Sequence, residues 1–223
     1  MNCRNLHDQL LRRTSRWWNA LFAIAVAVFL SMPNAQAQTF VIGAGAITTT
    51  STGNDPIDGY YNAMRHQVVY LASELSTGGM SAGDNLSGLG WSIAGDYAGG
   101  NLGNYTISIG HTAATNCAAH VADALTVVKN PFAYNPTVTA AGVFDMIPFD
   151  TQFMWNGTSN IVVDICTGTA NPFTGPYGTV RADTYTTGSR YKQQDGGTSQ
   201  CALNTVTANA NRPQIQFSYV GGS

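Results

Sequence analysis

Apolar and polar residues alternate in several short segments of the chain, and this pattern predicts β-strands. The clearest segment is 104–110, in which Tyr105, Ile107 and Ile109 face one side and Thr106 and Ser108 face the other. Comparable patterns predict further strands over residues 65–75, 87–94, 142–146, 149–154, 160–166 and 213–220. Turn-forming residues, mainly glycine, proline and asparagine, separate most of these segments.

One segment departs from the alternating pattern. Ala118, Val121, Ala122 and Leu125 have the spacing of one face of a helix, although residues 125–128 also fit a strand. We therefore expect a short helix or turn followed by a strand over 113–128. Many short strands without a long helix are typical of a β-sandwich or barrel. We predict an all-β fold, an antiparallel β-sandwich that is jelly-roll-like, with at most one short helix.

The first 37 residues have the three-part arrangement of a secretory signal peptide. Four arginines precede the uncharged apolar run 20–30, and Ala35-Gln36-Ala37 follows it as a cleavage site. The run is too short to cross the ~30 Å hydrocarbon core of a bilayer as a permanent helix. A buried N-terminal helix is the alternative interpretation. We expect a cleaved signal peptide over 1–37, an extended strand or linker over 38–55, and a single sandwich domain over 56–223.

Composition excludes several classes of protein. Only 10% of the 223 residues are charged, and 44% are hydrophobic, which argues against intrinsic disorder. Loss of the leader removes four of the 10 basic and one of the 12 acidic residues, which leaves a net charge of −5. A nucleic-acid partner needs a basic face, so none is expected. We expect a secreted or cell-surface protein without a permanent membrane span.

Three cysteines remain after the leader, and export would place them in an oxidising compartment. Cys166 ends a predicted strand, and Cys201 lies in a loop rich in glycine, serine and glutamine. We predict a Cys166–Cys201 disulfide and leave Cys117 free, buried or intermolecular. The pairing Cys117–Cys166 is the alternative. The cysteines lack the close spacing of zinc ligands.

Four segments of the chain resemble a module that recurs in secreted surface proteins of Bacteroidetes. These are 59–75, with its Arg-x-Gln-Val-Val-Tyr-Leu-Ala-Ser-Glu-Leu run, and residues 105–112, 155–166 and 211–215. The resemblance implies a jelly-roll sandwich with a cysteine pair, found beside adhesion-like domains, and it implies no catalytic residues. The chain ends at Gly221-Gly222-Ser223 without the C-terminal sorting tail of many such proteins.

The motif Gly79-Met80-Ser81-Ala82-Gly83 matches the nucleophile elbow of α/β-hydrolases. Both flanks are predicted to be loops, whereas an elbow needs a buried strand before it and a helix after it. A serine hydrolase that uses Ser81 is therefore the second alternative for function. It would need one of the three histidines outside the leader, which are His66, His111 and His120.

Acidic residues give two weaker candidates. Glu74, Asp145 and Asp150 were considered as glycosidase carboxylates, but their spacing does not bring them together. Asp55 and Asp58, with Asn54, are weak candidates for Ca²⁺ ligands. His120 and Asp123 would share a face if their segment were helical, but two ligands do not make a metal site. We expect no other cofactor.

Tyrosines give the most useful indication of function. Exposed aromatic rings stack on sugars and form adhesive hot spots. Our first hypothesis is a non-catalytic adhesive or structural module, which self-assembles if the neutral N-terminal strand pairs with the sheet edge of a neighbour. The first alternative is a carbohydrate-binding module, so the expected partners are surface glycans, other surface proteins or a second copy. The candidate contact residues lie in polar surroundings rich in glycine and proline, and they are Tyr60, Tyr61, Tyr134, Tyr177, Tyr185 and Tyr191.

Overall fold

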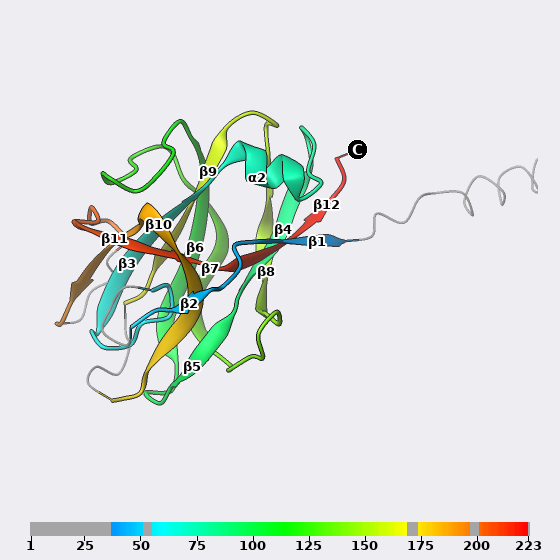
Figure 1. The fold of residues 1–223 in the computed structure, drawn as a ribbon. Helices are drawn as coiled ribbons and strands as arrows, with labels where there is room; N and C mark the ends of the chain where they lie inside the picture. The colour runs from blue at the N-terminus through cyan, green and yellow to red at the C-terminus, as the bar shows by residue number, and fades with distance from the viewer. Residues whose placement is uncertain (1–36, 51–54, 169–173, 197–200, 223) are drawn as a thin grey trace, which may run out of the picture. The chain divides into compact units, whose positions relative to one another are not determined.

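Two antiparallel β-sheets form the part of the chain that the computed structural model describes, which is residues 37–50, 55–168, 174–196 and 201–222. The first sheet has the strand order β1-β12-β4-β8. The second has the order β11-β10-β3-β9-β6-β7, and β2 and β5 also pair with β10. Figure 1 shows the elements β1 (Gln38–Ile42), β2 (Ile47–Thr48), β3 (Ala63–Tyr70), α2 (Ala72–Thr77), β4 (Asn85–Trp91), β5 (Ile93–Tyr97), β6 (Leu102–Thr112), β7 (Thr126–Tyr134), β8 (Asp145–Met154), β9 (Asn160–Cys166), β10 (Tyr177–Gln194), β11 (Thr207–Pro213) and β12 (Ile215–Val220).

Successive strands change sheets in the manner of a jelly roll. After β1, the chain places β3 in the second sheet, β4 in the first, β6 and β7 in the second, β8 in the first, β9 in the second and β12 in the first. Two Greek keys of this kind are what distinguishes a jelly roll from other sandwiches. The predicted all-β, antiparallel sandwich with one short helix is confirmed for the described residues. Within these ranges, none of the helical structure is long and apolar enough to span a bilayer.

The inner faces of the two sheets form one apolar core. Trp91 of β4, Phe217 of β12 and Ile107 of β6 are all fully buried in it. The indole nitrogen of Trp91 donates a hydrogen bond of 3.0 Å to the hydroxyl of Tyr105, which links the two sheets and satisfies two buried polar groups. Burial of each large apolar side chain contributes roughly 1.5–3 kcal/mol. The sandwich therefore needs few charges to be stable.

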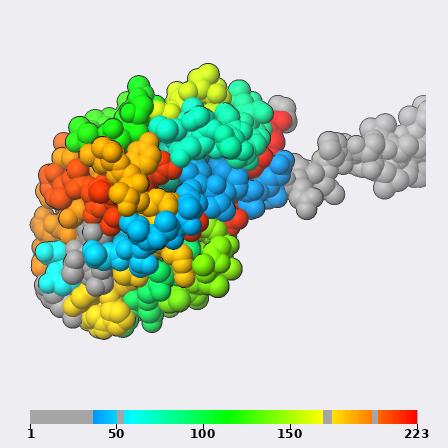
Figure 2. Space-filling model, viewed as in Figure 1, coloured from blue at the N-terminus to red at the C-terminus, as the bar shows by residue number. Residues whose placement is uncertain are grey.

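The segment expected to be an extended strand or linker is part of the sandwich up to Thr50. β1 pairs with β12 of its own chain, and β2 pairs with β10. The connection between them crosses the surface below α2, in blue in Figure 2. Asp183 fixes this crossing, because its carboxylate accepts hydrogen bonds from the backbone amides of Ala44, Gly45 and Ala46 at 2.8, 3.3 and 3.2 Å. If this segment also pairs with a neighbouring molecule, it must do so through the edge of β1 that does not face β12.

The strand predicted over 65–75 was wrong in its second half. β3 ends at Tyr70, and α2 follows from Ala72. The side chain of Glu74 accepts a hydrogen bond of 2.9 Å from the backbone amide of Leu71, and Asn160 accepts one of 2.8 Å from the amide of Ala72. These acceptors satisfy amides that are unpaired at the start of any helix. The alternation of apolar residues could not indicate this capping.

Of the short helix or turn expected over this part of the chain, residues 113–125 have no helix and form a series of bends, and the strand expected after it is present as β7 from Thr126. The backbone amide and carbonyl of Val121, which a helix would pair within itself, are bound by the side chain of Gln67 on β3. The Gln67 amide oxygen accepts from the Val121 amide, and the Gln67 amide nitrogen donates to the Val121 carbonyl, both at 3.0 Å. Val121 and Cys117 pack with Val69 and Val162 in a second, smaller apolar cluster. The helix-like spacing therefore reflects packing on the outside of the second sheet.

Candidate tyrosine-lined binding site

Four of the six candidate tyrosines come together at one end of the sandwich. The ring centroids of Tyr60 and Tyr61 lie 4.9 Å apart, and those of Tyr60 and Tyr177 lie 4.8 Å apart, each pair edge to face. Tyr191 is on the same side of β10 as Gln193, which donates to Asp58 of the loop that carries Tyr60 and Tyr61. Burial, and then the charges of Asp58 and Tyr61, raise the pKa of Tyr191. All four side chains are half-buried, so part of each ring faces solvent. We call Tyr60, Tyr61, Tyr177 and Tyr191 the tyrosine cluster.

A bend in β10 makes this cluster possible. Tyr177 begins the strand and Tyr191 lies near its end, so a straight strand would hold them far apart. The pairing with β11 is interrupted between Thr184 and Ser189, and Thr187 has a positive φ of 48°. Both ends of β10 consequently reach the loop before β3: the Tyr177 carbonyl accepts from the Gly59 amide at 3.1 Å, and Gln193 donates to Asp58 at 2.5 Å.

Two buried carboxyl groups, Asp55 and Asp58, lie in the same loop as Tyr60 and Tyr61. They are 1% and 2% exposed. Asp55 accepts from the Thr49 hydroxyl at 2.7 Å and the Ile57 amide at 2.9 Å, while Asp58 accepts from the Tyr60 amide at 2.8 Å and from Gln193. Burial raises the pKa of Asp58 to about 7. Burial, and then the charge of Asp58, raise the pKa of Asp55 well above its usual value.

These carboxyl groups are poorly arranged for the weakly predicted Ca²⁺ site. Their oxygen atoms already accept hydrogen bonds from N–H and O–H donors, so they are poorly available for direct coordination of Ca²⁺, which takes about six to eight oxygen ligands. In the described ranges no three His, Cys, Asp or Glu side chains group closely enough to hold a metal ion. Asn54, the third candidate ligand, lies outside the described residues.

Tyr134 and Tyr185, the other two candidate contact residues, do not belong to the cluster. Tyr134 is buried against Tyr105, at 4.7 Å between ring centroids, and its hydroxyl donates to Asp145 at 2.9 Å. Tyr185 lies under the guanidinium of Arg212, which is 4.5 Å from its ring centroid. Both rings have structural partners.

Ser81 lies in the turn between α2 and β4, where its backbone amide donates to Asp84 at 2.8 Å. The histidine contacts lie elsewhere. His111 on β6 accepts from the Asn156 amide at 3.1 Å, and Nδ1 of His120 accepts from the Thr205 amide at 3.1 Å. His66 is buried on β3. Among these contacts nothing joins Ser81 to an imidazole, so the geometry does not support the serine hydrolase alternative.

The remaining acidic candidates are held in separate local contacts. Glu74 pairs with Arg212, and Asp150 pairs with Lys129 at 2.7 Å. Asp145 accepts from Tyr134 and from the Thr137 amide. These contacts hold the three carboxyl groups in separate places, whereas a glycosidase needs a pair that faces a common cleft.

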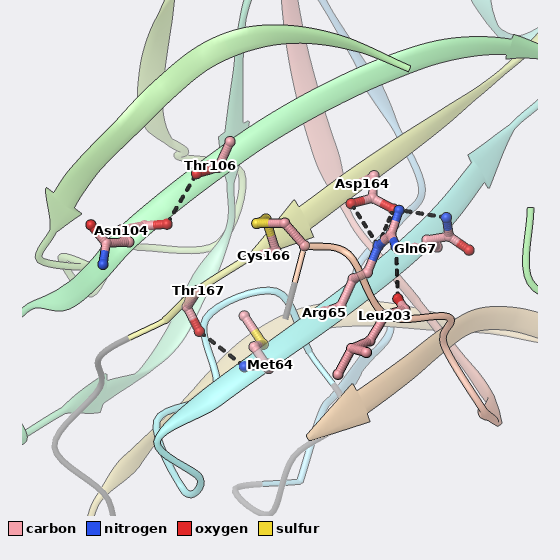
Figure 3. The surroundings of a disulfide bond; sticks show 10 residues. Met64, Arg65, Gln67, Asn104, Thr106, Asp164, Cys166, Thr167 and Leu203 are labelled. Atoms are coloured by element: carbon pink, nitrogen blue, oxygen red, sulfur yellow. Dashed lines mark hydrogen bonds and ion pairs between the residues drawn. A yellow bond between two sulfur atoms is a disulfide. The ribbon is translucent and has the colours of Figure 1, made fainter. Parts of the chain in front are cut away.

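The predicted Cys166–Cys201 disulfide is confirmed, and Cys117 is free and buried. Figure 3 shows the surroundings of the disulfide, which lies on the outside of the second sheet. There Arg65 pairs with Asp164 at 2.9 Å and donates a hydrogen bond of 2.7 Å to the Leu203 carbonyl. Burial raises the pKa of Asp164 to about 6, although Arg65 lowers it. The disulfide and Arg65 thus tie the segment after β10 to β3 and β9, next to the strand end that carries Tyr191 and Gln193.

Sequence reasoning missed Gln193 as a partner of Asp58. Its contribution depends on the pairing of the end of β10 with β3, and no local motif indicates it. Comparison with known proteins adds no assignment: no family model, no curated protein and no solved structure matches the chain. Interpretation of the tyrosine cluster therefore depends on its chemistry.

Proposed function

We propose that this chain is a non-catalytic, exported binding module that recognises glycans through the tyrosine cluster, and that its role is adhesive. The observation that supports this proposal best is the convergence of Tyr60, Tyr61, Tyr177 and Tyr191 from a loop and both ends of one strand. A core-lining role alone would not leave four rings half-exposed at one end of the sandwich. The cluster also lies beside polar groups that suit sugar hydroxyls, such as Gln193.

Glycans fit this surface for a physical reason. One side of a pyranose ring carries C–H groups that pack on aromatic rings, while its hydroxyl groups need hydrogen-bond partners nearby. Tyrosine offers both an apolar ring and a polar hydroxyl. The edge-to-face contacts hold Tyr60 in place before any ligand arrives, which lowers the entropy cost of binding.

Export is supported by two features. The leader pattern in residues 1–37 is that of a signal peptide, and those residues up to 36 lie outside the described part of the chain. The Cys166–Cys201 disulfide suits an oxidising compartment outside the cytosol. The resemblance to Bacteroidetes surface modules agrees with this location.

A glycan array tests the proposal. The purified protein should bind a subset of glycans, and Tyr60→Ala or Tyr177→Ala should reduce that binding at least tenfold. Tyr185→Ala is the matched control, because it removes a half-buried tyrosine outside the cluster. Equal binding by all three variants, or an array without signal, would contradict the proposal.

A self-associating structural role is the second candidate, and the edge strand β1 favours it. β1 pairs on one side only, with β12, and contains no charged residue and no proline to discourage a further strand. A groove of about 470 Å³ beside this strand is lined by residues 40–43 and by residues of α2 and its C-cap Gly78. Val41→Lys would suppress concentration-dependent association, measured by sedimentation, whereas Met154→Lys on the opposite edge strand would not. A monomer at every concentration would contradict this role.

A further inference from the structure

We infer that the tyrosine cluster selects glycans that carry free amino groups, such as glucosamine oligomers, over their N-acetylated counterparts and over acidic sugars. This inference deepens the proposed function and rests on it. It concerns the charge around the cluster, which the tyrosines themselves do not determine.

Acidic groups surround the cluster on the side of the loop and the end of β10. Asp58 accepts a hydrogen bond of 2.8 Å from the backbone amide of Tyr60, and its charge also acts on Tyr191. Asp195 is exposed and accepts from the amide of Asn62, the residue after Tyr61, at 3.3 Å. The loop that carries Tyr60 and Tyr61 is therefore bound by one buried and one exposed carboxyl group.

The basic residues nearest in the sequence are directed away from the cluster. Lys192 separates Tyr191 from Gln193 on β10, and successive residues of a strand point to opposite faces of the sheet. In the strand register, Lys192 is opposite Arg65, which is already paired with Asp164 on the outside of the second sheet. Arg190, which precedes Tyr191, donates to the backbone carbonyls of Thr205, Ala118 and Val206. These three cations therefore do not face the side of the strand that carries Tyr191 and Gln193, where buried His66 is the residue opposite Tyr191.

An ammonium group gains from this arrangement in two ways. Aromatic faces attract cations through their quadrupole, with a gain that grows as water is excluded. The carboxyl groups add a second attraction, and Asp58 retains a proton that it can release: burial raises its pKa to about 7, so an approaching cation favours the ionised form. A uronic acid or a sulfated sugar would instead meet carboxyl groups of like charge.

Calorimetry with two tetrasaccharides tests the inference. Glucosamine and N-acetylglucosamine tetramers of the same linkage are titrated into the purified protein at about pH 6, where the free amines are charged. We expect the glucosamine tetramer to bind about tenfold more tightly, a preference that falls as salt rises. Equal binding, or tighter binding of the N-acetylated tetramer, would overturn the inference and leave the proposed function standing.

Charge-neutralising variants separate the two proposals further. Asp195→Asn changes an exposed side chain and should reduce the preference for the amine about threefold without changing the affinity for the N-acetylated tetramer. Asp58→Asn should act in the same direction. Asp123→Asn, another exposed acid, is the matched control and should retain the preference. If Asp195→Asn behaves like Asp123→Asn, the inference is wrong; if neither tetramer nor any arrayed glycan binds, the proposed function falls and the inference with it.

Discussion

The buried carboxyl group of Asp58 makes a quantitative prediction about stability. Its pKa rises from 3.8 to about 7 because burial disfavours the charged form. The folded state therefore binds this proton more tightly than the unfolded state does. The stabilisation is complete below pH 3.8 and is lost as the pH rises through about 7. A shift of roughly three pKa units corresponds to about 4 kcal/mol, a large share of the ~5–15 kcal/mol typical of a domain.

Asp58→Asn replaces the titrating carboxyl group with a neutral amide. The free energy of unfolding of the variant should therefore depend less on pH between about 4 and 8. The asparagine side chain oxygen retains the hydrogen bond from the Tyr60 amide, and the Gln193 amide can rotate to accept from the new side chain amide. At about pH 4 both proteins are neutral here and should have similar stability. At about pH 8 the variant should be more stable than the wild type by up to about 4 kcal/mol.

Urea unfolding at several pH values measures the effect as a free energy of unfolding. The quantity to compare is the difference between variant and wild type at each pH, because titrating groups that do not interact with Asp58 cancel from it. Asp55 does not cancel, since the charge of Asp58 raises its pKa. A difference that grows steadily from pH 4 to 8 supports a buried, protonated Asp58. Two parallel curves would refute the argument, since they would mean that Asp58 titrates alike in the folded and unfolded states.

Three further substitutions test the packing around the site. Gly59→Ala should destabilise the fold by at least about 1–3 kcal/mol in thermal or urea unfolding, because a Cβ there would lie 1.9 Å from a carbon of the Tyr97 ring. Asp183→Ala should cost about 1–3 kcal/mol and increase amide hydrogen exchange at 44–46, whose amides lose their acceptor. Cys201→Ser should lower stability by about 3–4 kcal/mol, matching the effect of reductant on the wild type, because the disulfide joins residues 35 apart; unchanged melting with reductant would argue against that bond.

The strands that the sequence predicted well are those whose environment is regular. β6, β9 and β12 bury alternate or continuous apolar residues between two sheets, so period-two patterns and apolar runs report them directly. β10 and β11 were missed. β10 carries polar residues on both faces and pairs in turn with β5, β2, β3 and β11, so its environment changes along its length. A window of sequence cannot show such changes of partner.

The same limit applies to the candidate site. Composition indicated that tyrosines in polar surroundings matter, and this picked out the four members of the cluster together with Tyr134 and Tyr185. What separates the two groups is tertiary structure: Tyr134 meets Tyr105 and Asp145 across the strands, and Arg212 covers Tyr185. Burial of Asp55 and Asp58 was equally hidden, because Asp-Pro and Asp-Gly dipeptides usually mark exposed turns.

The tyrosine cluster lies at one end of the jelly roll because the inner faces of its sheets are filled by the core. The inner faces of both sheets are occupied by the core, and few side chains there are free to change. The bend in β10 lets both ends of one strand reach the loop of Asp58, at one end through the Tyr177 carbonyl and at the other through Gln193, which is also paired with β3. The disulfide and the Arg65 contact to Leu203 then hold the segment that follows β10. Selection can therefore vary the exposed rings and acids at this end without disturbing the core, which is the arrangement a binding module requires.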